Sequence, residues 1–418
     1  MTPEEFVKLK YGMFFHYGLF SSMARGEWVM NREQLSPDEM REIAKTFNPE
    51  KFNAEEICQL AVDAGMKYIV FVTMHHDGFR LFDTELSDHN SVKICGRDLV
   101  AEMVAACRKY GIKIALYHSL NNWFDQPDAV SALENKADYD KFIDATFARL
   151  KELVEKFKPI DVMWYDGWWP FNAEGWQAEK MNAMLKEIDP GLIFNGRNCL
   201  PGNFGTPERH LTAPVPYRPW EACMTLNNSW GYVEGDDTWK HPVEVSNMLR
   251  TCAEGGGNLL LNVAPRGDGS IPEATVEILR KVGSWLKNGG DEALTDCEPM
   301  PFTPTIASPD DRGDWDTQAD FTCSKNNLFI IMRYHPGFYT LTGLQCKALK
   351  ITCQGREIPF TQNGGKLHFE IPEDIRETFR PTFKVECDAP PAIYRCGGTR
   401  IPKVEHPRYD PITPDIEY

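Results

Sequence analysis

Six short runs of apolar residues, separated by helical segments, constrain the fold of the first part of the chain more than any other feature. Each run is nearly continuous in apolar residues, as expected for a parallel strand that is covered on both faces. The runs are residues 11–18, 67–78, 113–120, 159–167, 191–196 and 257–267. Alternation of strands and helices over this length predicts a (β/α)8 barrel or a doubly wound sheet.

The segments between the runs carry recognisable helix starts. Ser36 and Glu39 have the spacing of a capping box, and Asn53 and Asp98 are suitable N-cap residues for the next two helices. A longer stretch, residues 137–159, has apolar residues at helical spacing and ends at a proline. We therefore expect helices after these residues.

Polar side chains follow the apolar runs, and their positions favour the barrel. Catalytic groups of such barrels lie at the carboxyl ends of several different strands. No G-x-G-x-x-G pattern follows a strand, which weakens a nucleotide-binding interpretation. The sequence thus predicts an α/β fold with a (β/α)8, TIM-like barrel. The polar residues at the ends of the runs are His16, His75, His76, Asp77, Tyr117, His118, Asp166, Asn195, Arg197 and Asn262.

The composition changes around residues 296–313, which are rich in proline and aspartate. Beyond them apolar residues alternate with a period of two, for example in residues 366–371 and 382–387, so we expect a C-terminal antiparallel β-sandwich. The predicted domains are a catalytic barrel, residues 1–298, and a β-sandwich with an extended C-terminal arm, residues 299–418.

Composition excludes some partners. The net charge of -16 argues against nucleic acid or an anionic membrane surface. No run of about 18 or more apolar residues is present, so no membrane span is expected. The twelve cysteines form no C-x-x-C pair, and no signal peptide is visible at the N-terminus, which together favour reduced thiols and a cytoplasmic protein. The oligomeric state stays open, and a homo-oligomer is among the alternatives.

Asp166 lies within DVMWYDGWW, residues 161–169, among four aromatic side chains. An ionised carboxylate in such surroundings needs a partner, because its transfer into an apolar interior is costly. Asp166 either caps the next element or pairs with an arginine, or it serves as a nucleophile or acid/base group whose aromatic walls exclude water.

A retaining glycosidase needs a second carboxyl group about 5–5.5 Å from the first. Glu208, in the loop sequence GNFGTPERH, and Glu221, in RPWEACMT, are the candidates. The alternative for Glu208 is a plain exposed loop residue, and the alternative for Glu221 is an ion pair with Arg218. Spacing does not choose between the two acids, because we expect either segment to be a loop that reaches over the barrel mouth.

His75 and His76 invite a metal interpretation, but adjacent residues of a strand point to opposite faces. Zinc spacings such as H-E-x-x-H are absent, so we predict no metal and no cofactor. Imidazoles that bind substrate hydroxyls are favoured, with a core histidine as the alternative for one of them. Glu27 and Trp28 place a further acid beside a stacking surface.

Together these segments resemble the α-L-fucosidase family of retaining glycoside hydrolases. The resemblance runs from about Tyr11 to Gly290 through seven or more blocks in family order. These include YGMFFHYGLFS, GEWVM, TMHHDGF, RDLV, DVMWYDGWW, PWEACMT, NNSWGY and GGGNLLLNVAPRGDG. The family's barrel and C-terminal sandwich agree with the fold expected above.

The resemblance implies that Asp166 is the nucleophile that forms a covalent fucosyl-enzyme. Glu208 aligns best with the acid/base, with Glu221 as the alternative. Many relatives have two tyrosines where this chain has Tyr117 and His118, so the role of His118 is left open. The implied sugar pocket, to which Trp28 is added as a stacking surface, consists of Phe14, His16, Glu27, Trp28, His75, His76, Tyr117, Trp164, Arg197 and Trp230.

The leading hypothesis is an exo-acting, retaining α-L-fucosidase that needs no metal and acts on a fucosylated oligosaccharide or glycoconjugate. One alternative is a catalytically inactive fucose-binding protein on the same scaffold. Another is a metal-dependent hydrolase that uses His75 and His76. The sequence leaves the linkage (α1,2, α1,3, α1,4 or α1,6) and the natural glycan open.

Overall fold

A computed structural model describes residues 1–303 and 318–394, and the chain divides into two compact units, Met1–Arg280 and Lys281–Tyr418. The sequence placed the boundary later, after residue 298. Residues 281–298 belong with the second unit because they are bonded to it. The Trp285 indole donates to the Thr382 hydroxyl at 3.0 Å, and the Thr322 hydroxyl donates to the Ala293 carbonyl at 2.7 Å.

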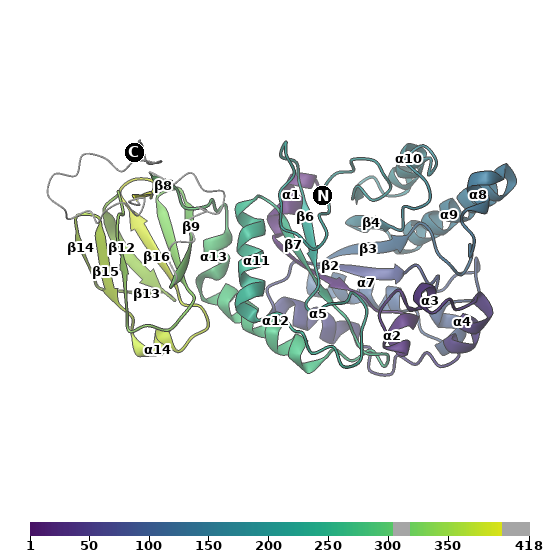
Figure 1. The fold of residues 1–418 in the computed structure, drawn as a ribbon, viewed down its shortest axis with the longest axis horizontal. Helices are drawn as coiled ribbons and strands as arrows, with labels where there is room; N and C mark the ends of the chain where they lie inside the picture. The colour runs from purple at the N-terminus through teal and green to yellow at the C-terminus, as the bar shows by residue number, and fades with distance from the viewer. Residues whose placement is uncertain (304–317, 395–418) are drawn as a thin grey trace, which may run out of the picture. The chain divides into compact units, whose positions relative to one another are not determined.

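The first unit is built on a curled parallel sheet of seven strands within the described residues (Figure 1). The strand order is β5-β4-β3-β2-β1-β7-β6, and every neighbouring pair is parallel. The strands are β1 (Tyr11–Phe15), β2 (Tyr68–Met74), β3 (Lys113–Ser119), β4 (Val162–Asp166), β5 (Ile193–Phe194), β6 (Glu221–Met224) and β7 (Asn258–Val263).

All six apolar runs contain a strand, so this prediction is confirmed. The sequence missed β6, because a strand of only four residues that begins with a charged side chain has no clear apolar run. The expectation of a loop at Glu221 is therefore wrong: Glu221 is the first residue of β6, paired in register with Asn258 of β7.

The barrel expectation is confirmed only in part, since the sheet is curled and parallel but is not a closed eight-stranded barrel. An irregular segment, residues 203–209, runs between the two edge strands and makes single parallel bridges on both sides. The Asn203 amide donates to the Phe194 carbonyl at 2.7 Å, and the Cys223 amide donates to the Pro207 carbonyl at 3.0 Å. This segment therefore occupies the position where an eighth strand was expected.

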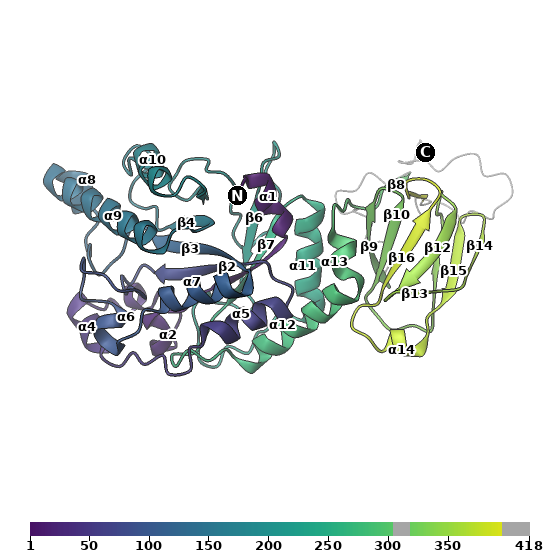
Figure 2. The same cartoon turned by 180° about the vertical axis from the view of Figure 1, so that it is seen from behind.

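Helices accompany the sheet along its outer side (Figures 1 and 2). The predicted N-caps are confirmed: Ser36 forms a capping box with Glu39, and Asn53 and Asp98 accept from amides of the first turn of their helices. The helices of this part are α1 (Pro3–Phe6), α2 (Leu19–Met23), α3 (Val29–Arg32), α4 (Pro37–Ala44), α5 (Ala54–Asp63), α6 (Ser91–Cys95), α7 (Leu99–Tyr110), α8 (Ser131–Glu134), α9 (Lys136–Phe157), α10 (Ala178–Ile188), α11 (Pro242–Glu254) and α12 (Glu273–Trp285), with the 3-10 turn η1 (Val7–Leu9) after α1.

The inner face of the sheet carries one connected apolar cluster, which fills the space that the strands enclose. Because side chains alternate along a strand, every second residue of each strand contributes to it. Its buried members are Phe6, Val7, Phe14, Tyr68, Val70, Val72, Ala115, Tyr117, Val162, Trp164, Ile193, Phe204, Cys223 and Leu260.

The second unit has two antiparallel sheets, so the predicted sandwich type is supported. The larger sheet has the order β13-β12-β16-β10-β9 and the smaller one β11-β15-β14, and both contribute side chains to one apolar core. The extended arm predicted at the C-terminus lies outside the described residues. The elements are η2 (Leu286–Gly290), α13 (Asp291–Leu294), β8 (Phe302–Thr303), β9 (Ala319–Ser324), β10 (Asn327–Met332), β11 (Phe338–Leu341), β12 (Ala348–Cys353), β13 (Arg356–Glu357), β14 (Phe360–Asn363), β15 (Lys366–Glu370), α14 (Glu373–Arg376), β16 (Thr382–Cys387) and β17 (Ile393–Tyr394).

The eleven cysteines among the described residues are free thiols. In the same residues no helix is both long enough and apolar enough to cross a membrane.

The register between β1 and β2 predicts a packing-sensitive position. Gly12 lies opposite Tyr68, and a methyl group at Gly12 would lie 2.3 Å from the Tyr68 ring. We expect Gly12→Ala to lower the free energy of unfolding by about 1–3 kcal/mol, because the buried ring has no room to move away. Urea unfolding measures the change. Ala105→Ser on the exposed side of α7 is the control, and equal stability of both variants would contradict this account of the interior.

Candidate active site

A small cavity of about 140 Å³ opens at the carboxyl ends of the parallel strands. Both acids expected at the reaction centre, Asp166 and Glu208, line it, and so do all ten residues of the implied sugar pocket. The lining residues are Phe14, His16, Glu27, Trp28, His75, His76, Tyr117, Trp164, Asp166, Trp168, Trp169, Arg197, Glu208, Cys223 and Trp230.

Strand alternation explains which side chains enter the cavity. Trp164 and Asp166 are two residues apart on β4, so both point inward. On β3 the same rule directs Tyr117 inward and His118 to the opposite face, where the His118 Nδ1 lies 3.0 Å from the Thr73 hydroxyl. His118 is therefore not part of the cavity lining.

Asp166 is nearly buried, with 13% of its side chain exposed, and it has the partners that its surroundings require. The Arg197 Nη1 donates to Oδ1 at 3.0 Å, and the Tyr117 hydroxyl donates to Oδ2 at 2.8 Å. Nε2 of His76 lies 3.6 Å from Oδ2. Burial and the Asp166 charge raise the pKa of Tyr117, so its hydroxyl keeps the proton that it donates.

Glu208 shares Arg197 with Asp166. The Arg197 Nη2 donates to the Glu208 Oε2 at 2.8 Å, and the Trp230 indole donates to Oε1 at 3.2 Å. The Glu208 side chain is 40% exposed, so it faces the opening while Asp166 lies deeper. The guanidinium of Arg197 therefore lies between the two carboxyl groups and binds both.

Arg197 is itself held in a fixed position. Its Nε donates to the Thr206 hydroxyl at 3.1 Å, and its Cζ lies 4.8 Å from the centre of the Trp164 ring. Burial lowers the pKa of Arg197, but Asp166, Cys223 and Glu208 together outweigh this effect and raise it, so the guanidinium stays charged. Thr206 and Glu208 belong to the irregular segment, residues 203–209. This segment therefore binds Arg197, which follows β5.

Glu221 lies elsewhere, below the cavity and fully buried, and does not line it. Its Oε1 accepts from the Trp164 indole at 2.9 Å, and its Oε2 accepts from the Tyr68 hydroxyl. Burial raises the pKa of Glu221 to about 7. Since Glu221 begins β6, it lies at the end of the sheet away from the opening, whereas Cys223, two residues further, reaches the cavity.

Three histidines form part of the wall, and burial keeps each of them neutral. It lowers the pKa of His16 and of His76 to about 3 and that of His75 well below its usual value. Nδ1 of His16 lies 2.7 Å from the Asn262 side chain, and Nδ1 of His76 lies 2.6 Å from the Ser119 hydroxyl. Nδ1 of His75 has no hydrogen-bond partner in the described structure. A neutral imidazole has one donor and one acceptor nitrogen, so a histidine of the cavity wall is suited to a hydroxyl group of a ligand.

Glu27 connects the loop after β1 to the segment that carries Trp230. Its Oε2 accepts from the Gly231 amide at 2.7 Å and from the Ser229 hydroxyl at 3.1 Å. Trp28 packs edge-on against His76, with ring centres 5.6 Å apart.

Sequence reasoning missed three lining residues, Trp168, Trp169 and Cys223. The two tryptophans follow directly after Asp166 and Gly167, so the same aromatic stretch contained the signal. Cys223 had none, because its place depends on the unpredicted strand β6.

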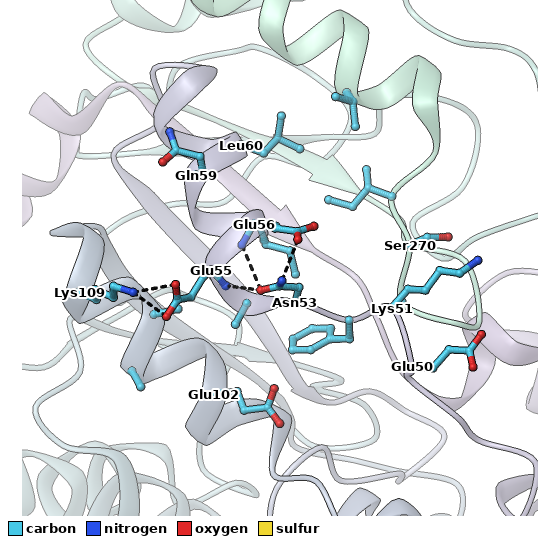
Figure 3. A pocket seen from close by; sticks show the side chains of 18 of the residues that line it. Glu50, Lys51, Asn53, Glu55, Glu56, Gln59, Leu60, Glu102, Lys109 and Ser270 are labelled. Carbon is cyan, nitrogen blue, oxygen red and sulfur yellow. Dashed lines mark hydrogen bonds and ion pairs between the residues drawn. The ribbon is translucent and has the colours of Figure 1, made fainter.

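Among the described residues no group of three or more histidine, cysteine, aspartate or glutamate side chains is arranged to hold a metal ion. A second, larger hollow of about 1120 Å³ lies among the covering elements, between α5, α7 and the segment before α12. Figure 3 shows two of the contacts among its lining residues: Lys109 binds Glu55, at 2.7 Å, and Asn53 caps α5. The paired acids and the aromatic walls belong to the smaller cavity.

Enzymes that cleave glycosidic bonds typically use two carboxyl groups that flank the bond to be broken. Asp166 and Glu208 are two carboxyl groups that line one cavity. The cavity is well below the roughly 300–1,000 Å³ of drug-sized ligand pockets, so it suits one small ring. Fold and site together define a glycoside hydrolase.

Comparison with known proteins gives the family. The α-L-fucosidase family model matches residues 1–291. Tissue α-L-fucosidase of Bos taurus is 32% identical over 321 residues, which cover 69% of this chain and 68% of that protein. The chain therefore belongs to the α-L-fucosidase family, and the resemblance found in the sequence is confirmed.

Solved structures show the same similarity. α-L-Fucosidase isoenzyme 1 from Paenibacillus thiaminolyticus has a TM-score of 0.77 and 28% identity, covering 93% of this chain and 100% of that one. The Thermotoga maritima α-fucosidase in complex with fucose has a TM-score of 0.72 and 26% identity, covering 92% of this chain and 97% of that one.

The buried Glu221 predicts a pH-dependent stability. Its carboxyl group stays protonated in the folded protein up to pH about 7, but in the unfolded chain it ionises near its usual pKa of 4.5. Its contribution to stability is thus present below pH about 4.5 and is lost as the pH rises to about 7. We expect Glu221→Gln, which cannot ionise, to gain stability relative to the unmodified protein by about 1 kcal/mol per pH unit across that range.

Thermal or urea unfolding at a series of pH values measures this difference. The matched control is Glu134→Gln, the same change at an exposed position of α8. Parallel stability profiles for Glu221→Gln and the unmodified protein would show that the buried carboxyl group does not titrate as described.

Proposed function

We propose that this glycoside hydrolase is an exo-acting, retaining α-L-fucosidase that removes terminal α-L-fucose from fucosylated glycans by double displacement. In this proposal Asp166 is the nucleophile and Glu208 is the acid/base. The observation that carries it is the single guanidinium of Arg197, which contacts one oxygen of each acid at 3.0 and 2.8 Å. This arrangement supports a short separation between the carboxyl groups, as a retaining mechanism requires.

In the first step an Asp166 oxygen attacks the anomeric carbon of fucose while the bond to the leaving oxygen breaks. Glu208 gives its proton to that oxygen, so the leaving group departs as a neutral alcohol and a fucosyl ester of Asp166 remains. Glu208 suits this role because it is the more exposed of the two acids and faces the opening.

In the second step Glu208 takes a proton from water, and the resulting hydroxide attacks the anomeric carbon. The ester bond to Asp166 breaks, which releases α-L-fucose and restores both carboxyl groups. Two inversions give net retention of configuration. Tyr117 and Arg197 compensate the charge that returns to Asp166, through the hydrogen bonds described above.

The remaining walls of the cavity fit fucose, which has a methyl group and three free hydroxyls. Phe14, Trp164 and Trp230 provide apolar surface, with the Phe14 ring 5.0 Å from Trp164 and 5.7 Å from Trp230. The neutral histidines, which line the cavity, provide hydrogen-bonding groups for the hydroxyls. The Thermotoga relative solved with fucose supports the same sugar. The small size of the cavity supports removal of a terminal residue.

Asp166→Gly tests the nucleophile. We expect turnover of an aryl α-L-fucoside to fall by at least about 10⁴-fold, because no covalent intermediate forms. Azide should then give the fucosyl azide of inverted, β configuration. Asp144→Ala, at an exposed position of α9, is the control. Normal turnover by Asp166→Gly would show that Asp166 is not the nucleophile.

Glu208→Ala tests the acid/base. For substrates with poor leaving groups we expect kcat/KM to fall about 10²–10⁴-fold, since the departing oxygen receives no proton. Activated aryl fucosides should keep much faster first-step rates, and azide should give the product of retained, α configuration. The same measurements on Glu174→Ala, another exposed loop glutamate, provide the comparison. A larger loss in Glu221→Gln than in Glu208→Ala would reverse the assignment.

A further inference from the structure

Trp168 is one of the residues that line the cavity and that have no role in the proposed reaction. It is a large apolar side chain, yet 42% of it is exposed. Its ring meets Trp169 edge-on at 5.6 Å, and the Cζ of Arg197 lies 5.7 Å from its centre. No residue in the described part of the chain accepts a hydrogen bond from its indole nitrogen.

The backbone that carries Trp168 is held firmly. Gly167 has a φ of +66°, and a side chain there would lie 2.4 Å from the Ser119 hydroxyl oxygen. The Trp168 carbonyl accepts a hydrogen bond from the indole of Trp176, which is fully buried. An exposed indole on a fixed backbone offers a binding surface without the entropic cost of ordering a loop.

The position of Glu208 indicates what reaches this surface. The acid that protonates the leaving oxygen must lie beside the leaving group, so the group attached to fucose lies on the Glu208 side of the cavity. Arg197 connects the two features, because it binds Glu208 at 2.8 Å and lies against the Trp168 ring. Trp168 therefore borders the path by which the leaving group enters and departs.

The other tryptophans of the cavity are already engaged. Trp164 is buried beneath Arg197, and Trp230 packs against His16 and Phe14. Trp28 and Trp169 pack against each other, with ring centres 5.6 Å apart, and both pack against His76. Trp168 makes a single aromatic contact and is the most exposed of the five.

We propose that Trp168 is a specificity-determining residue that binds the leaving-group sugar, a hexopyranose whose C–H face packs on the exposed indole. This inference rests on the proposed function, because it takes the leaving group to depart beside Glu208. Pyranose rings present apolar C–H faces, which pack against aromatic rings as other apolar groups do. The residue acts on the substrate beyond fucose, so it selects among glycans without taking part in bond cleavage.

The test compares two kinds of fucosyl substrate, which differ only in the leaving group. α-L-Fucosyl fluoride releases fluoride, which has no surface to pack on Trp168. Fucosyl-hexopyranose disaccharides of all four linkages place a sugar ring at that position. We expect Trp168→Ala to lower kcat/KM for the best disaccharide by about tenfold more than for the fluoride, which corresponds to the loss of one aromatic packing contact.

Trp168→Phe keeps an aromatic face and should retain disaccharide activity within about threefold of the unmodified enzyme. Tyr334→Ala, an exposed aromatic residue of the second unit, is the control and should change neither substrate. Equal losses for both substrates, or no loss for the disaccharide, would overturn the role of Trp168. Unmodified enzyme that cleaves the fluoride but none of the disaccharides would overturn the hexopyranose assignment. Failure to cleave the fluoride at all would instead contradict the proposed function.

Discussion

The contact of Arg197 with both Asp166 and Glu208 is the interaction on which the site depends. It brings a carboxylate at the end of β4 and another on an irregular segment to the same guanidinium, although 42 positions separate them in sequence numbering, 166 to 208. Loss of one partner from a buried ion pair leaves an uncompensated charge and costs about 3–5 kcal/mol. The arrangement of the acids is therefore tied to the arginine and to the segment after β5 that positions it.

A second layer of contacts below the cavity supports the first. Glu221 accepts hydrogen bonds from both the Tyr68 hydroxyl and the Trp164 indole, and Trp164 lies beneath Arg197. A buried acid with a pKa raised to about 7 is a destabilising feature at neutral pH, and its hydrogen bonds fix the ring on which the charged pair lies. Stability and catalytic geometry are thus connected through one aromatic side chain.

Much of the fold could be predicted from the sequence, because the signals were local. The apolar runs identified six parallel strands, and cap residues such as Ser36 and Asp98 identified helix starts. The short strand β6 was missed because it begins with Glu221 and has no clear apolar run. The irregular segment at the open edge of the sheet could not be predicted either, because it is defined by bonds to strands on both sides.

The sequence by itself determined the family and most of the residues gathered in the cavity, since many of them lie at or near the carboxyl ends of strands that face the same opening. Only the tertiary structure decided which of the two glutamates joins Asp166. Glu221 lies at the amino end of a strand and Glu208 lies at the opening. Because successive strand residues advance by about 3.3 Å, the path of the backbone decides which of the two glutamates reaches the cavity. That path is set by hydrogen bonds between segments far apart in the chain, which no local pattern encodes.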